Sequence, residues 1–238
     1  SMDNKTYLRY SLLGALGAAL MLVGDLCLSV IPAANGDSGL FLREAYFAGG
    51  FQPWRLPLLV GTGVCGMALC SFAVKICYEQ ILPQYRKTRM LMRVCGVIYL
   101  TSAMAIHLLI GALADWTSTL GQVLGCEQTG ELVAEQYNRV APALALPYVG
   151  MVGMILISAF AVLSKRTVLP QKIFLFNMLV WQLVLMLIPD IRQMLGAKIS
   201  SWDFVLSQGS GNAALLIWML ANAIWALCRI KNERREKV

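Results

Sequence analysis

The chain has 238 residues, of which 58% are hydrophobic and only 14% charged, and its formal net charge is +7. A soluble domain of this length carries about a quarter charged residues, so the composition excludes a soluble globular protein and indicates a polytopic membrane protein. The seven cysteines contain no CxxC pair, which argues against a disulfide framework, a redox motif or a zinc site. We expect no metal and no cofactor.

Six apolar segments predict six transmembrane helices. Most contain the roughly 17–25 residues that a helix needs to cross about 30 Å of hydrocarbon, and the fifth segment is the shortest. The segments cover residues 10–31, 56–76, 90–114, 143–163, 173–188 and 212–228, and a basic tail follows at 229–238. We therefore expect an all-α helical bundle in which residues 1–238 form one transmembrane domain.

Basic residues are concentrated in alternate connections between these segments. The N-terminal segment, residues 75–93, residues 164–172 and the tail hold 15 of the 20 Lys and Arg residues, whereas the rest of the chain holds 5 of them and 9 of the 13 acids. The positive-inside rule then predicts that both termini lie in the cytoplasm. The tail is typical of a stop-transfer cluster that contacts anionic lipid rather than of a nucleic-acid site. Membrane lipids are the expected partners, and homo-oligomers are left open.

Asp25 lies in the outer part of the first segment, about 7 Å past its midpoint at 1.5 Å per residue. A charged side chain in hydrocarbon costs roughly 3 kcal/mol or more, so this residue needs a partner or a function. Arg55 begins the second segment directly after Trp54, at about the same depth. Two interpretations stay open. Asp25 and Arg55 form an ion pair that joins two helices, or they have a direct role in ligand binding or catalysis.

The outer connections are long, at residues 32–54, 115–142 and 189–211. Apolar residues around a few charges predict a short helix at the membrane surface within 38–51, and a second short helix is expected within 121–139. These connections either form a lid over a polar chamber or only link the helices.

Glycine-rich runs occur in two places. Residues 61–66 match the pattern GxGxxG, which binds dinucleotides only in a soluble βαβ unit. Inside a membrane segment the same small residues predict close helix packing. Residues 207–211 are rich in Gly and Ser and are expected to precede a helix that begins at Asn212. The free amides of that helix end can receive an anion, although capping by Ser210 or Asn212 explains the run as well.

His107, the only histidine, lies in the outer half of the third segment. A single histidine excludes a bis-histidine haem and a three-histidine metal centre, and leaves a mixed site with aspartates as a weaker option. His107 serves either as a proton-transfer group or as a hydrogen-bonding partner of a neighbouring helix. Asp115 follows about 12 Å further out, and Asp190 follows Pro189 at the end of the fifth segment.

These positions define the predicted ligand site in the outer half of the membrane. Its residues are Asp25, Trp54, Arg55, His107, Asp115, Asp190 and Asn212. His107 and Asp25 are the candidates for catalytic roles.

Several short motifs resemble a family of bacterial six-span membrane proteins with no assigned activity. The motifs are Gly24-Asp25, Trp54-Arg55, His107, Leu169-Pro170 and Gly211-Asn212. The resemblance implies the six-span fold and a bacterial plasma membrane, and highlights the same residues without supplying a chemistry. The sequence lacks the multiple-histidine patterns of alkaline ceramidase-like hydrolases, so a zinc hydrolase is not expected.

Three functions remain open. The first is the binding or sensing of a lipid-like or other amphipathic small molecule in a blind pocket, because a mostly apolar cavity with a few polar groups is the usual form of such a site. The second is an intramembrane enzyme that uses His107 and an aspartate as acid and base. The third is a small transporter, which the largely apolar inner half of the bundle disfavours.

Overall fold

The computed structural model describes residues 2–34, 37 and 42–236 of the chain. In these residues the regular secondary structure is helical, apart from one isolated bridge between Ile81 and Thr167. The elements are α1 (Asn4–Ser29), α2 (Glu44–Phe47), α3 (Arg55–Glu79), α4 (Arg86–Leu124), α5 (Cys126–Leu163), the 3-10 helix η1 (Gln171–Phe176), α6 (Met178–Met194) and α7 (Ser201–Arg235). The predicted all-α fold is confirmed.

Six helical segments of the described chain are long and apolar enough to span a membrane. They are α1, α3, α4, α5, η1 with α6, and α7. This arrangement confirms the six predicted helices and indicates a multi-pass membrane protein. The fifth span is longer than predicted, because η1 and α6 together cover Gln171–Met194.

Three of the helices extend far beyond their predicted ends. α4, α5 and α7 contain 39, 38 and 35 residues, which corresponds to about 50–60 Å at 1.5 Å per residue. The predicted connection 115–142 is therefore two helices joined at Gly125, whose φ of 83° permits the sharp turn. The separate short helix expected within 121–139 was a wrong prediction. Glu, Gln and Ala favour helix, so the polar stretch continues the two apolar helices.

The start of the last helix was also predicted wrongly. α7 begins at Ser201, where Ser200 and Asp203 form a capping box, and Asn212 lies a full 11 positions further along the same helix. Residues 207–211 lie within this helix, and Gly209 lets α7 approach α1 closely. A Cβ atom at Gly209 would lie only 2.9 Å from the Leu22 side chain.

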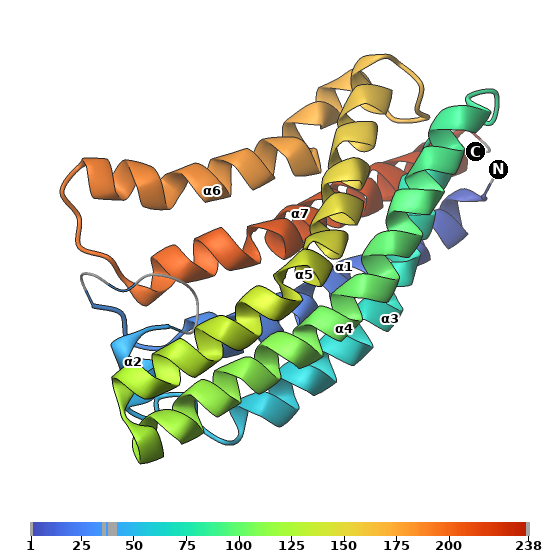
Figure 1. The fold of residues 1–238 in the computed structure, drawn as a ribbon. Coiled ribbons are helices and arrows are strands. Elements are labelled where there is room, and N and C mark those ends of the chain that lie inside the picture. The colour runs from blue at the N-terminus through green and yellow to red at the C-terminus, as the bar shows by residue number, and fades with distance from the viewer. Residues whose placement is uncertain (1, 35–36, 38–41, 237–238) are drawn as a thin grey trace.

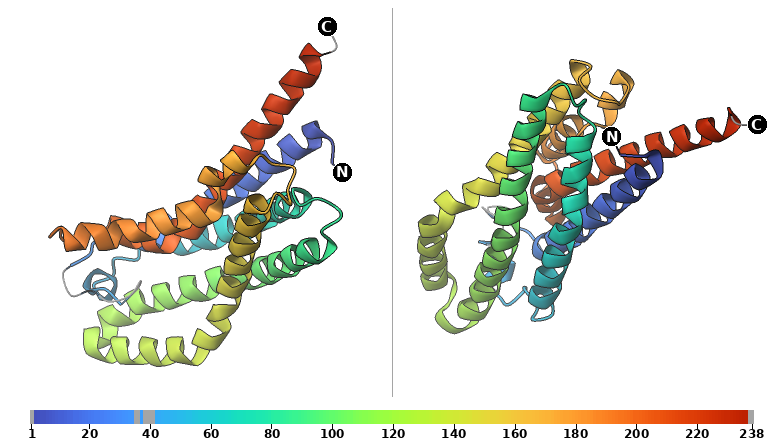
Figure 2. Two further views of the ribbon diagram at one scale, coloured as in Figure 1. Left: turned by 90° about the horizontal axis from the view of Figure 1, so that it is seen from above. Right: turned by 90° about the vertical axis from the view of Figure 1, so that its right-hand side faces the viewer.

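The bundle has both chain termini at one end, which we call the terminal end, and the turn between α4 and α5 at the opposite end, the distal end (Figure 1). α1 packs between α3 and α7, α4 packs against α3 and α5, and α6 packs against α7. The last turns of α7 project beyond the other helices at the terminal end (Figure 2).

Small residues bring these helices together, as the sequence predicts for the 61–66 run. A Cβ at Gly17 would lie 2.6 Å from the backbone nitrogen of Cys70, and one at Gly66 would lie 3.0 Å from the Gly17 carbonyl oxygen. α4 and α5 meet in the same way, since a Cβ at Gly150 would lie 2.6 Å from the Tyr99 nitrogen. Gly61 faces open space and takes no part.

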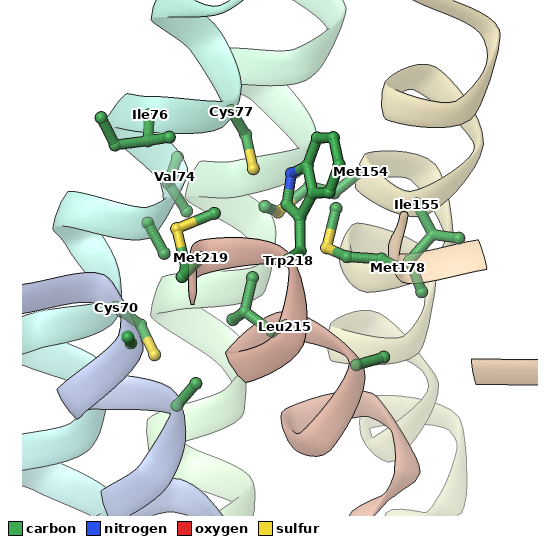
Figure 3. Packing of buried hydrophobic residues seen from close by; sticks show 14 of the residues in the cluster. Cys70, Val74, Ile76, Cys77, Met154, Ile155, Met178, Leu215, Trp218 and Met219 are labelled. Atoms are coloured by element: carbon green, nitrogen blue, oxygen red, sulfur yellow. The ribbon is translucent and has the colours of Figure 1, made fainter. Parts of the chain in front are cut away.

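The main hydrophobic core fills the terminal half of the bundle. Trp218 of α7 is fully buried and lies between Cys77 of α3 and Met154 of α5, with Met178 of α6 beside it (Figure 3). Met219 of the same turn of α7 is equally buried. These large side chains form a packed layer across the bundle, which we call the core plug.

A smaller core lies at the distal end, where α2 packs against the hairpin formed by α4 and α5. Tyr46 of α2 is fully buried, and the Phe51 backbone nitrogen donates to Ser118 Oγ at 3.2 Å. The short helix expected within 38–51 is thus present at Glu44–Phe47, but its buried side contacts protein. The residues 38–41 of that prediction lie outside the described residues.

Candidate functional site

A cavity of about 110 Å³ lies among α1, α3, α4, α5 and α7, on the distal side of the core plug. This volume is several times what one water molecule needs. Three of the predicted site residues, Asp25, His107 and Asn212, line it. The other lining residues are Met21, Gly24, Leu28, Leu59, Tyr99, Ala103, Ile106, Ile110, Pro147, Tyr148, Met151, Gln208 and Gly211. The wall is therefore mostly apolar, with polar groups from four helices.

Asp25 is held by α7. Asn212 Nδ2 donates to Asp25 Oδ2 at 2.7 Å, and the Tyr99 hydroxyl donates to Asn212 Oδ1 at 3.3 Å. The second carboxylate oxygen, Oδ1, has no hydrogen-bond partner among the described residues. Asp25 is only 9% exposed and lines the cavity, so this oxygen is left for a molecule bound there.

His107 lies where two glycines make room for its ring. A Cβ at Gly63 would lie 3.2 Å from His107 Cβ, and one at Gly24 would lie 3.4 Å from Cε1. In the described part of the chain no side chain or backbone group hydrogen-bonds to the imidazole. The interpretation of His107 as a hydrogen-bonded link between helices therefore finds no support in the contacts, and its ring nitrogens are available to a bound molecule.

Arg55 and Trp54 are directed away from the cavity. Arg55 donates from one terminal nitrogen to the Cys27 carbonyl oxygen at 2.7 Å, and its guanidinium lies over the Trp54 ring at 5.0 Å. Trp54 itself is exposed. The described residues contain no Asp25–Arg55 ion pair, so that alternative is wrong. Arg55 instead satisfies one of the last carbonyl groups of α1, which have no partners within the helix.

Arg43 completes the same cap, and sequence reasoning did not single it out. Its two terminal nitrogens donate to the carbonyl oxygens of Leu28, Ser29 and Ile31 at 2.8 to 3.3 Å, although the residue is fully buried. The Tyr46 hydroxyl donates to the Leu28 carbonyl oxygen. Burial raises the pKa of Tyr46 to about 12, so the hydroxyl keeps its proton and remains a donor. We call Arg43, Tyr46 and Arg55 the α1 cap.

Asp115 and Asp190 lie outside the cavity wall as well. Asp115 is half-buried further along α4, and Asp190 is exposed on α6. The ion pair that does join α6 and α7 nearby is Arg192–Asp203, at 3.1 Å. The seven predicted site residues are thus not brought together: three share the cavity, and four lie elsewhere.

Three polar residues of the cavity were missed by the sequence reasoning, namely Tyr99, Tyr148 and Gln208. Tyr99, Ala103, Ile106, His107 and Ile110 share one face of α4, and their spacing of three and four residues would have identified Tyr99. Tyr148 follows Pro147, which lies inside α5. Proline removes a helical hydrogen bond, and α5 bends in this region (Figure 1).

The terminal half of the bundle holds more buried polar groups than the sequence suggested. The Tyr7 hydroxyl donates to Asn222 Oδ1 at 2.6 Å, and Gln80 and Asn177 both donate to Ser158 Oγ, at 3.3 and 3.0 Å. These bonds join helices to one another, as short polar side chains commonly do in membranes. The core plug, with Leu215, Trp218 and Met219 of α7, separates them from the cavity.

A metal site is not evident among the described residues. Across residues 2–34, 37 and 42–236, no group of three or more His, Cys, Asp or Glu side chains is placed to hold a metal ion. Asp25 and His107 are the two side chains of these types that line the cavity.

Comparison with known proteins places the chain in a family but gives it no activity. No curated protein and no solved structure matches it. The model of a family of unknown function, DUF6796, matches residues 2–228, which is nearly the whole chain. The protein therefore belongs to the DUF6796 family.

Proposed function

We propose that this protein binds or senses a small amphipathic, lipid-like molecule in the cavity between α1, α4 and α7. The observation that carries the proposal is the convergence of Asp25, His107 and Asn212 from three helices on one mostly apolar wall. Asp25 Oδ1 and the ring nitrogens of His107 have no hydrogen-bond partners in the described chain, so they can form hydrogen bonds with a ligand. A mostly apolar cavity with a few such groups is the usual form of a small-molecule site.

The lining indicates what the ligand looks like. Ile106, Ile110 and Met151 offer apolar surface to a chain or ring, and Asp25 accepts a hydrogen bond or pairs with a positive charge. Tyr148 lines the cavity and is 53% exposed on the outside of α5. We infer that the ligand enters from the lipid beside the bend of α5, with its polar group directed toward Asp25.

The core plug favours a pocket that is closed toward the terminal end, rather than a transport path through the bundle. The fully buried side chains of Trp218 and Met219 occupy the bundle between the cavity and the terminal end. A transporter needs polar groups that continue through the membrane, usually along broken helices. Tyr7 and Asn222, and Gln80 and Asn177 with Ser158, are instead hydrogen-bonded to one another in the terminal half.

We also propose that the terminal end faces the cytoplasm of a bacterial cell, so that the cavity lies in the extracytoplasmic half of the plasma membrane. The basic residues gathered at the terminal end support this orientation. Cys126 and Cys228 are exposed near opposite ends of the bundle. In intact cells, a membrane-impermeant maleimide should label a variant that keeps only Cys126 and spare one that keeps only Cys228. The reverse labelling would overturn the orientation.

The binding proposal is tested by filling the cavity. Ala103 lines the cavity, whereas Ala105 lies on the exposed face of the same helix. Protein purified in native lipid discs should yield a bound amphiphile by mass spectrometry, and Ala103→Phe should reduce its amount about tenfold or more, a loss of roughly 1.4 kcal/mol. Ala105→Phe is the matched control and should change nothing. Equal amounts of every small molecule in the two variants would refute the proposal.

An intramembrane enzyme is the second candidate, because two titratable side chains, Asp25 and His107, share the cavity and His107 keeps its nitrogens free. General acid–base catalysis needs such groups within reach of the reacting atoms. Once a bound amphiphile is identified, His107→Ala separates the two functions. Loss of turnover with retained binding supports the enzyme, and unchanged turnover removes His107 from any mechanism.

A further inference from the structure

A second cavity lies at the terminal end, between the end of α3 and the start of α4. Its volume is about 320 Å³, and it is lined by Tyr78, Pro83, Arg86, Arg89, Met90 and Arg93. No part of the proposed ligand site contributes to it. We call it the arginine cavity.

The three arginines of this cavity lie on one face of α4, because they are spaced three and four residues apart. Arg89 is held in place, with one terminal nitrogen 3.2 Å from Glu79 Oε2 and its guanidinium 4.1 Å above the Tyr78 ring. Its Nε is a buried donor without a partner. Arg86 and Arg93 are exposed, and neither forms an ion pair or hydrogen bond within the described residues.

The charge balance of the arginine cavity is strongly positive. Glu79 is the acid that touches this group, and it is shared between Arg89 and Lys75, whose Nζ lies 2.7 Å from Glu79 Oε1. Arg86 also begins α4, and Tyr85 provides no side-chain cap there. The free amides and the positive end of the helix dipole add to the charge of the guanidinium groups.

The surface beside the arginines is apolar and exposed. Met90 and Leu91 are 66% and 54% exposed, and Val94 and Val97 follow along the same helix at 46% and 51%. A lipid with its headgroup among the arginines would lay its acyl chains along this strip. Guanidinium groups bind phosphate through paired hydrogen bonds. An anionic headgroup fits this cluster better than a zwitterionic one, because the ammonium group of a zwitterionic lipid is repelled by the arginines.

We propose that the arginine cavity binds the phosphate of an anionic phospholipid. Arg86 and Arg93 contact the phosphate oxygens, Arg89 and Tyr78 form the floor, and the acyl chains lie along the strip from Met90 to Val97. Basic pockets at the ends of membrane helices bind phosphate headgroups in this way. The site is independent of the ligand cavity, so either proposal can fail without the other.

The test compares two equal reductions of charge. Arg86→Gln with Arg93→Gln changes the cavity, and Arg139→Gln with Lys198→Gln removes the same amount of charge from exposed residues on α5 and in the α6–α7 connection. Each protein is incubated with phosphatidylglycerol and phosphatidylcholine in detergent, and retained lipid is counted by native mass spectrometry. The cavity variant should lose its preference for phosphatidylglycerol about tenfold or more, a loss of roughly 1.4 kcal/mol, and the control variant less than about twofold. Equal thermal unfolding temperatures confirm that both variants fold.

Two results would overturn the proposal. An equal loss of phosphatidylglycerol in the two variants would mean that net charge, and not this cavity, attracts the lipid. A separate arm adds inorganic phosphate at millimolar concentration. If free phosphate displaces the lipid completely and binds as tightly by itself, the site is one for soluble phosphate and the acyl strip plays no part.

Discussion

The α1 cap and the ligand cavity lie next to each other, and both contain ionisable residues near the distal end of the first helix. In the cap, the polar groups of Arg43, Tyr46 and Arg55 are directed at backbone carbonyl oxygens that would otherwise be unsatisfied. In the cavity, Asp25 keeps one oxygen free and His107 has no hydrogen-bond partner in the described chain. The comparison teaches that a binding site is distinguished from a structural cap by hydrogen-bonding atoms that have no partner in the protein. The presence of ionisable residues alone does not distinguish the two.

The largest expected effect comes from Arg43. Replacing Arg43 by Met removes a fully buried guanidinium and its hydrogen bonds to the carbonyl groups of Leu28, Ser29 and Ile31. The Leu28 carbonyl keeps the Tyr46 hydroxyl and the Ser29 carbonyl keeps the Ile31 backbone N–H, whereas the Ile31 carbonyl loses its donor. Because a hydrogen bond to a charged group contributes roughly 1.5–3 kcal/mol, and several are lost, we expect a loss of roughly 3 kcal/mol or more in the free energy of unfolding. Thermal unfolding in detergent measures this loss. A stable Arg43→Met protein would show that the cap is not needed for the fold.

Replacing Asp25 in the cavity should have the opposite result: ligand binding should weaken while stability is kept. Asp25→Asn keeps an oxygen that can accept from Asn212, so stability should change by less than about 1 kcal/mol. Binding of the amphiphile should weaken about tenfold to a hundredfold, because the amide NH2 takes the place of the free carboxyl oxygen and a polar group left without its partner costs about 1–3 kcal/mol. Ligand titration of the purified protein measures this change. Asp190→Asn, the same substitution at an exposed residue, is the control and should bind normally.

If Asp25→Asn lowers the unfolding temperature as strongly as Arg43→Met does, while the folded variant binds its ligand with unchanged affinity, the contrast between cap and cavity is wrong. Asp25 would then belong with Arg43 as structural support.

The sequence predicted the six spans and the cavity residues Asp25 and His107 because both depend on local signals. Asn212 was included as the first residue of a helix, whereas it lies inside α7. Asp25 and His107 are isolated polar residues in apolar helices, which is the strongest signal that a membrane sequence offers. The distant partner is harder to predict: nothing in the sequence reveals that Asn212 lies beside Asp25, because that depends on how closely Gly209 lets α7 approach α1.

The errors have physical causes as well. Arg55 and Asp25 were expected to pair because they lie at similar depth, but depth does not fix rotation about the helix axis. Arg55 is directed at the end of α1 and Asp25 toward α7. The lengths of α4, α5 and α7 were underestimated, since hydropathy marks where a helix leaves the membrane and not where the helix ends.

The smallest expected effect is that of Arg55→Met, which tests whether Arg55 belongs to the ligand site. Arg55→Met removes one charged hydrogen bond to the Cys27 carbonyl oxygen from a part-buried position, so the free energy of unfolding should fall by only about 1–2 kcal/mol. Affinity for the amphiphile should stay within about twofold of the unmodified protein, because Arg55 is not part of the cavity wall. Parallel unfolding and ligand titrations check both values. A large loss of affinity at unchanged stability would extend the binding site to the end of α1 and show that the cap and the cavity act as one unit.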